Sequence, residues 1–355
     1  MSRSNSARIQ RSWALAVAGC VVLVGCGGGG TGDDPAAARP CHGIVPQAQV
    51  EGFLDARGTP MDDLKDRADE EPQQCNFRPD GGSDRLFDEL DVEVGRSTSS
   101  GELLRNVQRR QSDTAGYTVS PIGHGWRGVL NTTSADATAA VVMLCEGKDG
   151  KGGDGLTVNL TARQLGGVHD EITEPKRLEL ARLATATAVN AAERAGCEAP
   201  RGKTVRKLAE PVPETGPGTP ARAASGTCEG IDARTRETAA DPLAPVEDCV
   251  VLDAKGEPAF RVAAYYGPFV QDGSVATYKR GDSGLFDGPS GGADGVYWAS
   301  ASCPAQGGTA FFTSETVRKG ERLVEPDPGA QRAALKELAR RSAERHSCAQ
   351  PRFDG

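Results

Sequence analysis

The chain has 355 residues, with 41 Lys and Arg against 49 Asp and Glu, 10 Cys, 45 Gly and 22 Pro, and a net charge of −8. This length suggests two domains of ordinary size, and the 37% apolar content is enough for two modest cores. The acidic balance argues against a nucleic-acid-binding protein, and no apolar run reaches the roughly 20 residues that span a bilayer, which excludes a multi-pass membrane protein.

The N-terminus has the pattern of an export signal followed by a lipid attachment site. Three arginines precede the 12-residue apolar segment Trp13–Val24, which is too short to span a bilayer but has the length of a secretory signal core. The segment runs into Leu-Val-Gly-Cys, which looks like a bacterial lipobox. We therefore expect residues 1–25 to be a signal peptide and Cys26 to carry the lipid; Cys20 is the alternative site.

The predicted anchor decides where the protein resides. Two acyl chains hold a protein stably on a membrane, whereas one chain gives only marginal binding. Removal of residues 1–25 leaves 38 basic residues against 49 acidic ones, a net charge of −11, so charge alone would not hold the chain on anionic head groups. We expect a protein on the outer face of the cell membrane, with residues 26–40 as a flexible tether.

Eight further cysteines form two sets of four. An even number of cysteines in an exported chain indicates disulfides. Because no Cys-x-x-Cys pair occurs and only four histidines are present, we expect no metal site and no cofactor. The first set is Cys41, Cys75, Cys145 and Cys197, and the second set is Cys228, Cys249, Cys303 and Cys348.

The two sets have matching surroundings, which indicates an internal duplication. Each set opens with Cys-x-Gly-Ile, and each ends 22 residues after the proline of a Glu-Pro pair. We therefore expect two related units, residues 41–198 and 228–355. The segment between them, 199–227, is rich in Pro and Gly and has no hydrophobic period, so it is predicted to be a linker between independently moving units.

Hydrophobic periodicity predicts an α+β fold for each unit, a small antiparallel sheet covered by helices. In the first unit the predicted elements are a helix over Pro46–Arg57, a strand around 90–94, a helix over 101–112, strands 138–145 and 156–162 forming a hairpin, and a helix that ends at Cys197. The apolar stripe of that last helix is Leu180, Leu183, Ala184, Thr187, Ala188, Ala191 and Ala195.

The second unit repeats this plan with strands at 249–252 and 296–303 and a closing helix that starts after Pro328. The apolar stripe of the closing helix is Leu335, Leu338, Ala339 and Ser342.

Four cysteines allow three pairings in each unit, and the sequence alone does not choose among them. We predict that neighbours pair, because the third cysteine lies at the end of a strand over which the last helix must pack. Each closed loop would contribute on the order of 3–4 kcal/mol. The predicted bridges are Cys41–Cys75, Cys145–Cys197, Cys228–Cys249 and Cys303–Cys348.

The lipobox-like segment, the Cys-x-Gly-Ile openings and the helices that end in cysteine together give a resemblance to a known group. The pattern resembles the uncharacterised lipoproteins of high-GC Gram-positive, Streptomyces-like bacteria, whose exported domains carry two disulfides around a small α+β sheet. The resemblance implies a surface-anchored domain and supplies no catalytic residues. The chain departs from it by having two units in tandem.

Two short motifs formally fit serine hydrolases. Gly281–Gly284 matches the nucleophile segment of trypsin-like proteases at Ser283, and Gly288–Gly292 has the spacing of a nucleophile elbow at Ser290. Both lie in a loop rich in Gly, Asp and Ser, and no histidine lies in a recognisable partner motif. We therefore expect no catalytic residues and no enzyme, with a hydrolase as the minor alternative.

Other polar residues have structural interpretations. His42 corresponds to Glu229 in the second unit, so we expect a surface turn residue there. His346 falls in the last turn of the closing helix, where the helix dipole favours a cation. Asp149 and Asp154 lack the carboxylate spacing of a calcium loop, so they are predicted to belong to a hairpin loop.

Adjacent aromatic residues in the second unit are candidates for partner or ligand contact. Neighbouring residues on a strand face opposite sides, so one ring of each pair is expected in the core and the other on the far face. The alternative is that the closing helix or the first unit covers them. The candidates are Tyr265, Tyr266, Tyr297 and Trp298.

Two functional hypotheses follow. The first is a non-catalytic interaction or sensing module that binds an extracytoplasmic protein through exposed sheet surface. The second is a receptor for a small molecule or lipid, which needs a pocket of at least ~300 Å³ between helix and sheet or between units. The sequence favours the first hypothesis.

Overall fold

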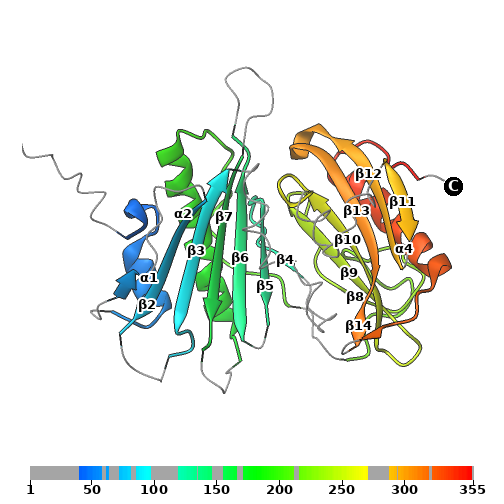
Figure 1. Ribbon diagram of the computed structural model, residues 1–355, viewed down its shortest axis with the longest axis horizontal. Coiled ribbons are helices and arrows are strands. Elements are labelled where there is room, and N and C mark those ends of the chain that lie inside the picture. The colour runs from blue at the N-terminus through cyan, green and yellow to red at the C-terminus, as the bar shows by residue number, and fades with distance from the viewer. Residues whose placement is uncertain are drawn as a thin grey trace, which may run out of the picture.

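A computed structural model describes residues 40–57, 61–63, 72–80, 85–96, 119–133, 135–145, 155–165, 171–211, 216–270, 288–293, 295–319 and 322–353. The predicted signal peptide, the lipidation site Cys26 and the predicted helix over 101–112 lie outside these residues. The described chain is α+β, as predicted, with two antiparallel sheets packed against helices (Figure 1).

The first half, residues 40–211, contains one of the sheets, in the strand order β1-β2-β3-β7-β6-β5-β4. The helix predicted after the first cysteine and the hairpin of β6 and β7 are both present. The elements are η1 (Pro40–Gly43), α1 (Gln47–Phe53), β1 (Met61–Asp63), β2 (Gln73–Pro79), β3 (Glu89–Arg96), β4 (Ser120–Pro121), β5 (Gly128–Thr132), β6 (Asp136–Met143), β7 (Leu156–Arg163) and α2 (Glu174–Ala195).

The second half, residues 216–353, contains the other sheet, in the order β11-β12-β13-β10-β9-β8. A short hairpin of β14 and β15 precedes the closing helix α4. The elements are β8 (Thr235–Glu237), β9 (Val246–Leu252), β10 (Pro258–Tyr266), β11 (Ser290–Ala293), β12 (Val296–Cys303), η3 (Pro304–Gln306), β13 (Gly308–Thr316), β14 (Arg318–Lys319), β15 (Arg322–Leu323) and α4 (Pro328–Arg345).

The two sheets have the same topology. In the first half β2, β3, β5, β6 and β7 are arranged as β2-β3-β7-β6-β5, and in the second half β9 to β13 are arranged as β9-β10-β13-β12-β11. In both halves one more strand, β1 or β8, pairs with the outer side of β2 or β9, and a long helix follows the last strand.

The four disulfides pair neighbouring cysteines, as predicted, with two bridges in each half. Each half has one bridge that joins its first cysteine to β2 or β9, and one that joins the end of β6 or β12 to the end of the long helix. The bridges are Cys41–Cys75, Cys145–Cys197, Cys228–Cys249 and Cys303–Cys348, with sequence separations of 34, 52, 21 and 45 residues.

The long helices have clear start and stop signals. Pro175 stands in the first turn of α2, where a missing N–H breaks no hydrogen bond, and Gly196 ends the helix with a left-handed φ of 62°. Asp327 caps α4 by accepting a hydrogen bond from the backbone N–H of Ala330. The predicted apolar stripes are buried against the sheets except at Ala195, which is exposed.

The sheets face each other on the sides that their long helices leave uncovered, giving a helix–sheet–sheet–helix order (Figure 1). Along β6, Ala139 and Val141 point toward the helix side, whereas Ala140 and Val142 point toward the second sheet. The apolar cluster between the halves consists of Val119, Val129, Ala140 and Val142 from the first half and Ala244, Val246, Ala263, Tyr265, Phe269, Trp298 and Phe311 from the second.

Polar contacts also cross between the halves. The backbone N–H of Val119 donates to Asp248 Oδ2 at 3.0 Å, and both atoms are buried. The guanidinium of Arg127 donates to the side chain of Gln306 and to the carbonyl of Ala305. The halves therefore form one packed body, which corrects the prediction of independently moving units.

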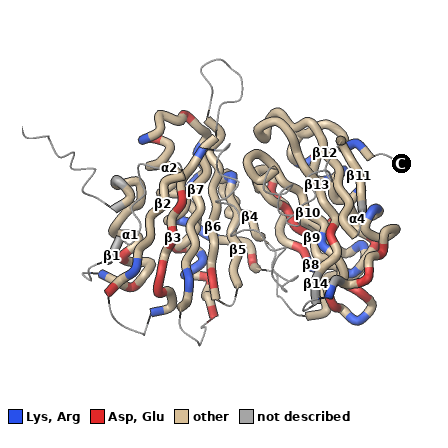
Figure 2. The backbone as a smooth tube through the Cα atoms, viewed as in Figure 1, with Lys and Arg blue, Asp and Glu red and all other residues tan. Residues whose placement is uncertain are grey.

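The face of the first sheet that is turned toward the second half has a charged part, outside the apolar cluster between the halves. Figure 2 shows acidic positions in red along β3. Their carboxylates pair with arginines on the neighbouring strands, Glu89 with Arg78 at 2.6 Å and Asp91 with Arg163. This change from charged to apolar along one face explains which strands the second sheet covers, because burying the ion pairs would require desolvating them.

Most of the described part of the predicted linker packs on one half or the other. Val205 and Leu208 are buried in the core of the first half, and the carbonyls of Val205 and Ala209 accept hydrogen bonds from arginines of α2. On the other side, Thr219 pairs with Thr235 and belongs to the second half. The absence of a hydrophobic period reflects an irregular segment whose apolar side chains are widely spaced.

Candidate functional site

Of the two serine motifs that fit hydrolases, the structure describes only the one at Ser290, and it does not form a nucleophile elbow. Ser290 lies in strand β11, which pairs with β12, and so it does not stand on a strand-to-helix elbow. Ser283 and His169 lie outside the described residues, as do Asp149 and Asp154. His124 lies on an exposed turn, 2.8 Å from the carbonyl of Lys207.

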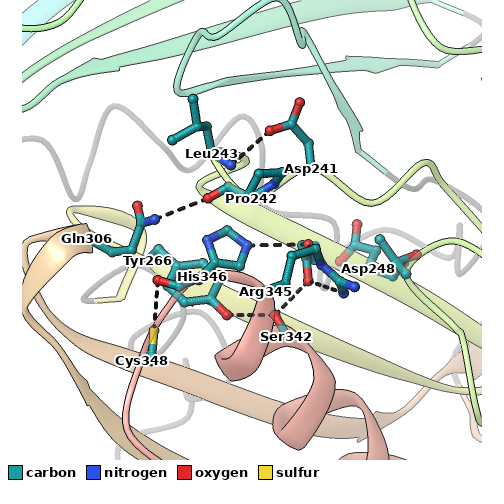
Figure 3. Close-up of polar contacts among 12 residues, drawn as sticks. Asp241, Pro242, Leu243, Asp248, Tyr266, Gln306, Ser342, Arg345, His346 and Cys348 are labelled. Atoms are coloured by element: carbon teal, nitrogen blue, oxygen red, sulfur yellow. Dashed lines mark hydrogen bonds and ion pairs between the residues drawn. The ribbon is translucent and has the colours of Figure 1, made fainter.

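A buried polar cluster joins α4 to the second sheet. Ser342 and His346 of the α4 end both contact the carboxylate of Glu247 on β9, at 2.6 Å and 3.3 Å. Arg345 forms a two-point ion pair with the same carboxylate, with its Nε 2.9 Å from Oε1. The hydroxyl of Tyr266 lies 2.6 Å from Ser342 Oγ and donates to it, because the Ser342 hydrogen is used on Glu247 (Figure 3).

This cluster contains a serine, a histidine and a carboxylate, but its connectivity differs from that of a catalytic triad. In a triad the histidine lies between the serine and the carboxylate. Here Ser342 and His346 bind the same carboxylate separately, and both side chains are buried, so no substrate carbonyl reaches the serine. The arrangement is suited to holding the helix end on the sheet.

The charge on Glu247 is stabilised by its partners. Burial alone would raise the pKa of this carboxyl, but hydrogen bonds from His346 and Arg345 and their charges lower the pKa to about 2. Burial and the nearby Glu247 charge raise the pKa of Tyr266 well above its ordinary value. His346 is the C-cap of α4, as its predicted place at the helix end implies, but its burial and its contact with Glu247 were not predicted.

The predicted contact aromatics are all buried, with exposed fractions between 1% and 7%. The two faces separate as expected for adjacent strand residues: Tyr266 and Tyr297 lie in the core under α4, and Tyr265 and Trp298 lie in the cluster between the halves. The closing helix and the first half therefore cover these rings, as the alternative interpretation expected. The prediction of an exposed aromatic patch at these residues is wrong.

A groove of about 590 Å³ lies on the first half. Four segments line it: α1 with Arg57 just after it, the Trp126 turn, α2 and residues 202–205. Its lining residues are Ala48, Gln49, Gly52, Phe53, Arg57, Trp126, Glu179, Arg182, Thr185, Ala186, Val189, Gly202, Lys203, Thr204 and Val205.

The walls of the groove are fixed by hydrogen bonds. Trp126 Nε1 donates to the carbonyl of Lys203 at 2.8 Å, and Arg182 Nε donates to the carbonyl of Val205 at 2.8 Å. Gly202 lies so close to the indole that a Cβ at this position would overlap Trp126. On the other wall, Lys176 of α2 donates to the carbonyl of Phe53 at 2.9 Å and so holds the end of α1.

The groove combines apolar lining with a cationic rim. Arg57, Arg182 and Lys203 are exposed, and the part of the chain that the structure describes gives none of the three an ion pair. Glu179 is the acidic lining residue, and it is already paired with Lys176 at 3.2 Å. The rim is thus locally positive on a chain whose net charge is −8.

This groove could not be predicted from the sequence, because its residues come from four separated segments and none belongs to a motif. A second hollow, of about 450 Å³, lies beside the Cys145–Cys197 bridge, and its rim residues Arg96 and Gly155 adjoin parts of the chain outside the described residues.

Comparisons with known proteins do not assign the site. No family model, curated protein or solved structure matches the chain. Within the described ranges no group of three or more His, Cys, Asp or Glu side chains is placed to bind a metal ion. None of the helices described is long and apolar enough to cross a membrane.

Proposed function

We propose that this chain is an exported, lipid-anchored binding protein that acts without catalysis and holds a small ligand in the groove between α1 and α2. The observation that carries the proposal is the groove itself: about 590 Å³ is within the range of about 300–1,000 Å³ that small-molecule sites occupy. Its walls are already fixed by hydrogen bonds, so little ordering would oppose binding.

The disulfides support the extracytoplasmic location. Four bridges form and persist in an oxidising compartment, as found outside the cytoplasm. Attachment to the outer face of the membrane through Cys26 remains part of the proposal, as does an origin of the two halves in a duplication. The shared strand order and the matching disulfide positions support that origin.

Burial of the sheet faces favours a ligand-binding role over partner binding through sheet surface. One face of each sheet is covered by its helix, and much of the other face packs against the opposite half. The groove belongs to the first half, so we propose that the halves differ in role and that the second half supports the first.

The proposal is tested by filling the groove with a large side chain and measuring whether the protein still retains a small molecule. Ala186 lines the groove on α2, and Ala186→Trp would occupy the space of a ligand. Native mass spectrometry of the protein extracted from its membrane should find a small molecule retained by the unmodified chain and lost in the variant. Ala333→Trp, the same exchange at an exposed position of α4, is the matched control. Equal masses bound to the unmodified chain and to Ala186→Trp would contradict the proposal.

The anchor has a separate test. Cys26→Ser should move the protein from the membrane fraction to the medium or the soluble extracytoplasmic fraction, whereas Cys20→Ser should leave it on the membrane. The opposite result would assign the lipid to Cys20.

A further inference from the structure

We infer that the ligand of the groove is a single-chain anionic amphiphile, with an apolar chain along the groove and a carboxylate or similar anion at the rim. This inference rests on the proposed function and adds the chemical class of the ligand.

The apolar part of the ligand is indicated by the floor and walls. Phe53, Trp126 and Val189 present ring and methyl surfaces to the groove, and Gly52 and Ala186 leave room between the helices. A chain of methylene groups gains roughly 0.8 kcal/mol for each group removed from water, so an apolar body is the natural occupant of such a lining.

The charge of the ligand is indicated by the rim. The guanidinium of Arg57 lies over α1, 3.7 Å from the point where a Cβ of Gly52 would stand. The carbonyl of Lys203 accepts a hydrogen bond from Trp126, and its backbone N–H donates to the carbonyl of His124, so the wall contacts do not use its side chain. Lys203 is exposed and lines the groove. With Arg182 these cations place charge and several N–H donors at one opening, which matches an anionic oxygen group.

The size of the groove limits the occupant to a small molecule. The space of about 590 Å³ suits one extended chain with its head group, whereas a stable protein–protein interface needs at least about 1,000 Å² of buried surface. Local positive charge on an acidic chain would also select against cationic and neutral amphiphiles of the same length.

The experiment uses residues 27–355, which omit the predicted lipidation site Cys26 and retain every described residue, and three probes. Laurate carries the chain and the charge, dodecanol carries the chain alone, and acetate carries the charge alone. Isothermal titration should show laurate binding at least about tenfold more tightly than dodecanol, because a charge-assisted hydrogen bond contributes about 1.5–3 kcal/mol. Acetate should give no measurable binding.

The rim is tested with a double variant. Arg57→Gln with Lys203→Gln should reduce laurate affinity to that of dodecanol, while Arg206→Gln with Lys207→Gln removes two exposed cations that do not line the groove and should change nothing. In a Trp298→Phe background Trp126 is the remaining tryptophan of the mature chain, so quenching or a spectral shift on adding laurate locates the probe in the groove.

The outcomes separate the inference from the proposed function. Equal binding of laurate and dodecanol, or unchanged laurate binding in the Arg57 and Lys203 double variant, overturns the anionic class. If the anionic class is overturned but the unmodified chain retains a small molecule that the Ala186→Trp variant lacks, the proposed function stands. If no probe binds and Ala186→Trp loses nothing, both are overturned.

Discussion

The imidazole of His346 stacks on the phenol of Tyr266, with ring centroids 3.8 Å apart and planes inclined by 15°. The two rings come from the end of α4 and the end of β10, so the stack joins the helix to the sheet beside the buried Glu247, which contacts His346. A carboxylate with 1% of its surface exposed is tolerated there because a serine, an arginine and a histidine share its charge.

The folded protein should lose stability in acid through Glu247. Its pKa is about 2 in the folded state against an ordinary value of 4.5, so its stabilising effect is complete above pH 4.5 and is lost as the pH falls toward 2. That shift corresponds to a loss on the order of 3 kcal/mol in the free energy of unfolding. Urea unfolding at pH 7, 4 and 2.5 measures it.

The matched variants make this test specific. Glu247→Gln should lower the free energy of unfolding at pH 7 by about 3 kcal/mol, because it leaves Arg345 without its buried anion, and should remove most of the acid dependence. Glu193→Gln, which removes an exposed carboxylate paired with Arg201, should change stability by less than about 0.5 kcal/mol. An equal acid response in both variants would show that Glu247 is not the group responsible.

The eight cysteines should resist alkylation until the protein is reduced. Mass spectrometry of the unreduced, unfolded chain should find none of them modified, and peptide mapping should recover the four bridges. Replacing Cys303 and Cys348 together with Ala should lower the free energy of unfolding by about 4 kcal/mol, because it opens a loop of 45 residues. A bridge between the halves would contradict the fold.

The two halves should unfold together. Phe311 lies in the apolar cluster between the sheets, and Phe311→Ala should lower stability by about 3–5 kcal/mol and split one calorimetric transition into two. Phe353→Ala removes the same side chain from a position that is 36% exposed and should leave a single transition. Two separate transitions in the unmodified protein would contradict the packed arrangement.

The contact of Gly202 with Trp126 should be intolerant of a methyl group. Gly202→Ala would place its Cβ in the indole, so the ring must move, at about 1–3 kcal/mol of stability, and its fluorescence should shift toward that of an exposed tryptophan. Gly329→Ala, in the first turn of α4, meets no close neighbour other than Asp327 Oδ1 at 3.5 Å and should be neutral. An unchanged emission spectrum in Gly202→Ala would count against a rigid groove wall.

Much of the secondary structure could be predicted because its signals are local. The stripe from Leu180 to Ala191 and the proline and glycine at the ends of α2 define that helix without reference to the rest of the chain. The cysteine pairing followed because a strand end and a helix end must meet in each half. These predictions needed only one segment and its nearest partner.

The packing between halves and the groove could not be predicted in this way. The strands that carry Tyr265 and Trp298 show the same alternation of side chains whether their outer face meets water or another sheet. Glu247 in a strand looks like an exposed residue until its contacts with Ser342 and Arg345 of α4 and with the C-cap residue His346 are known. The groove depends on four segments that are distant in the sequence, so only the folded chain brings Arg57 and Lys203 to one rim.

The face-to-face packing also bears on how the protein is made. In the proposed export of the chain the first half crosses the membrane ahead of the second, so the first sheet can form, and its two bridges can close, before residues 244–311 arrive to cover Val129 and Val142. During that interval the first half would expose an apolar sheet surface that is prone to aggregation. Holding chaperones would have their greatest effect at that moment, and the arrival of β9, β10, β12 and β13 would end the need for them.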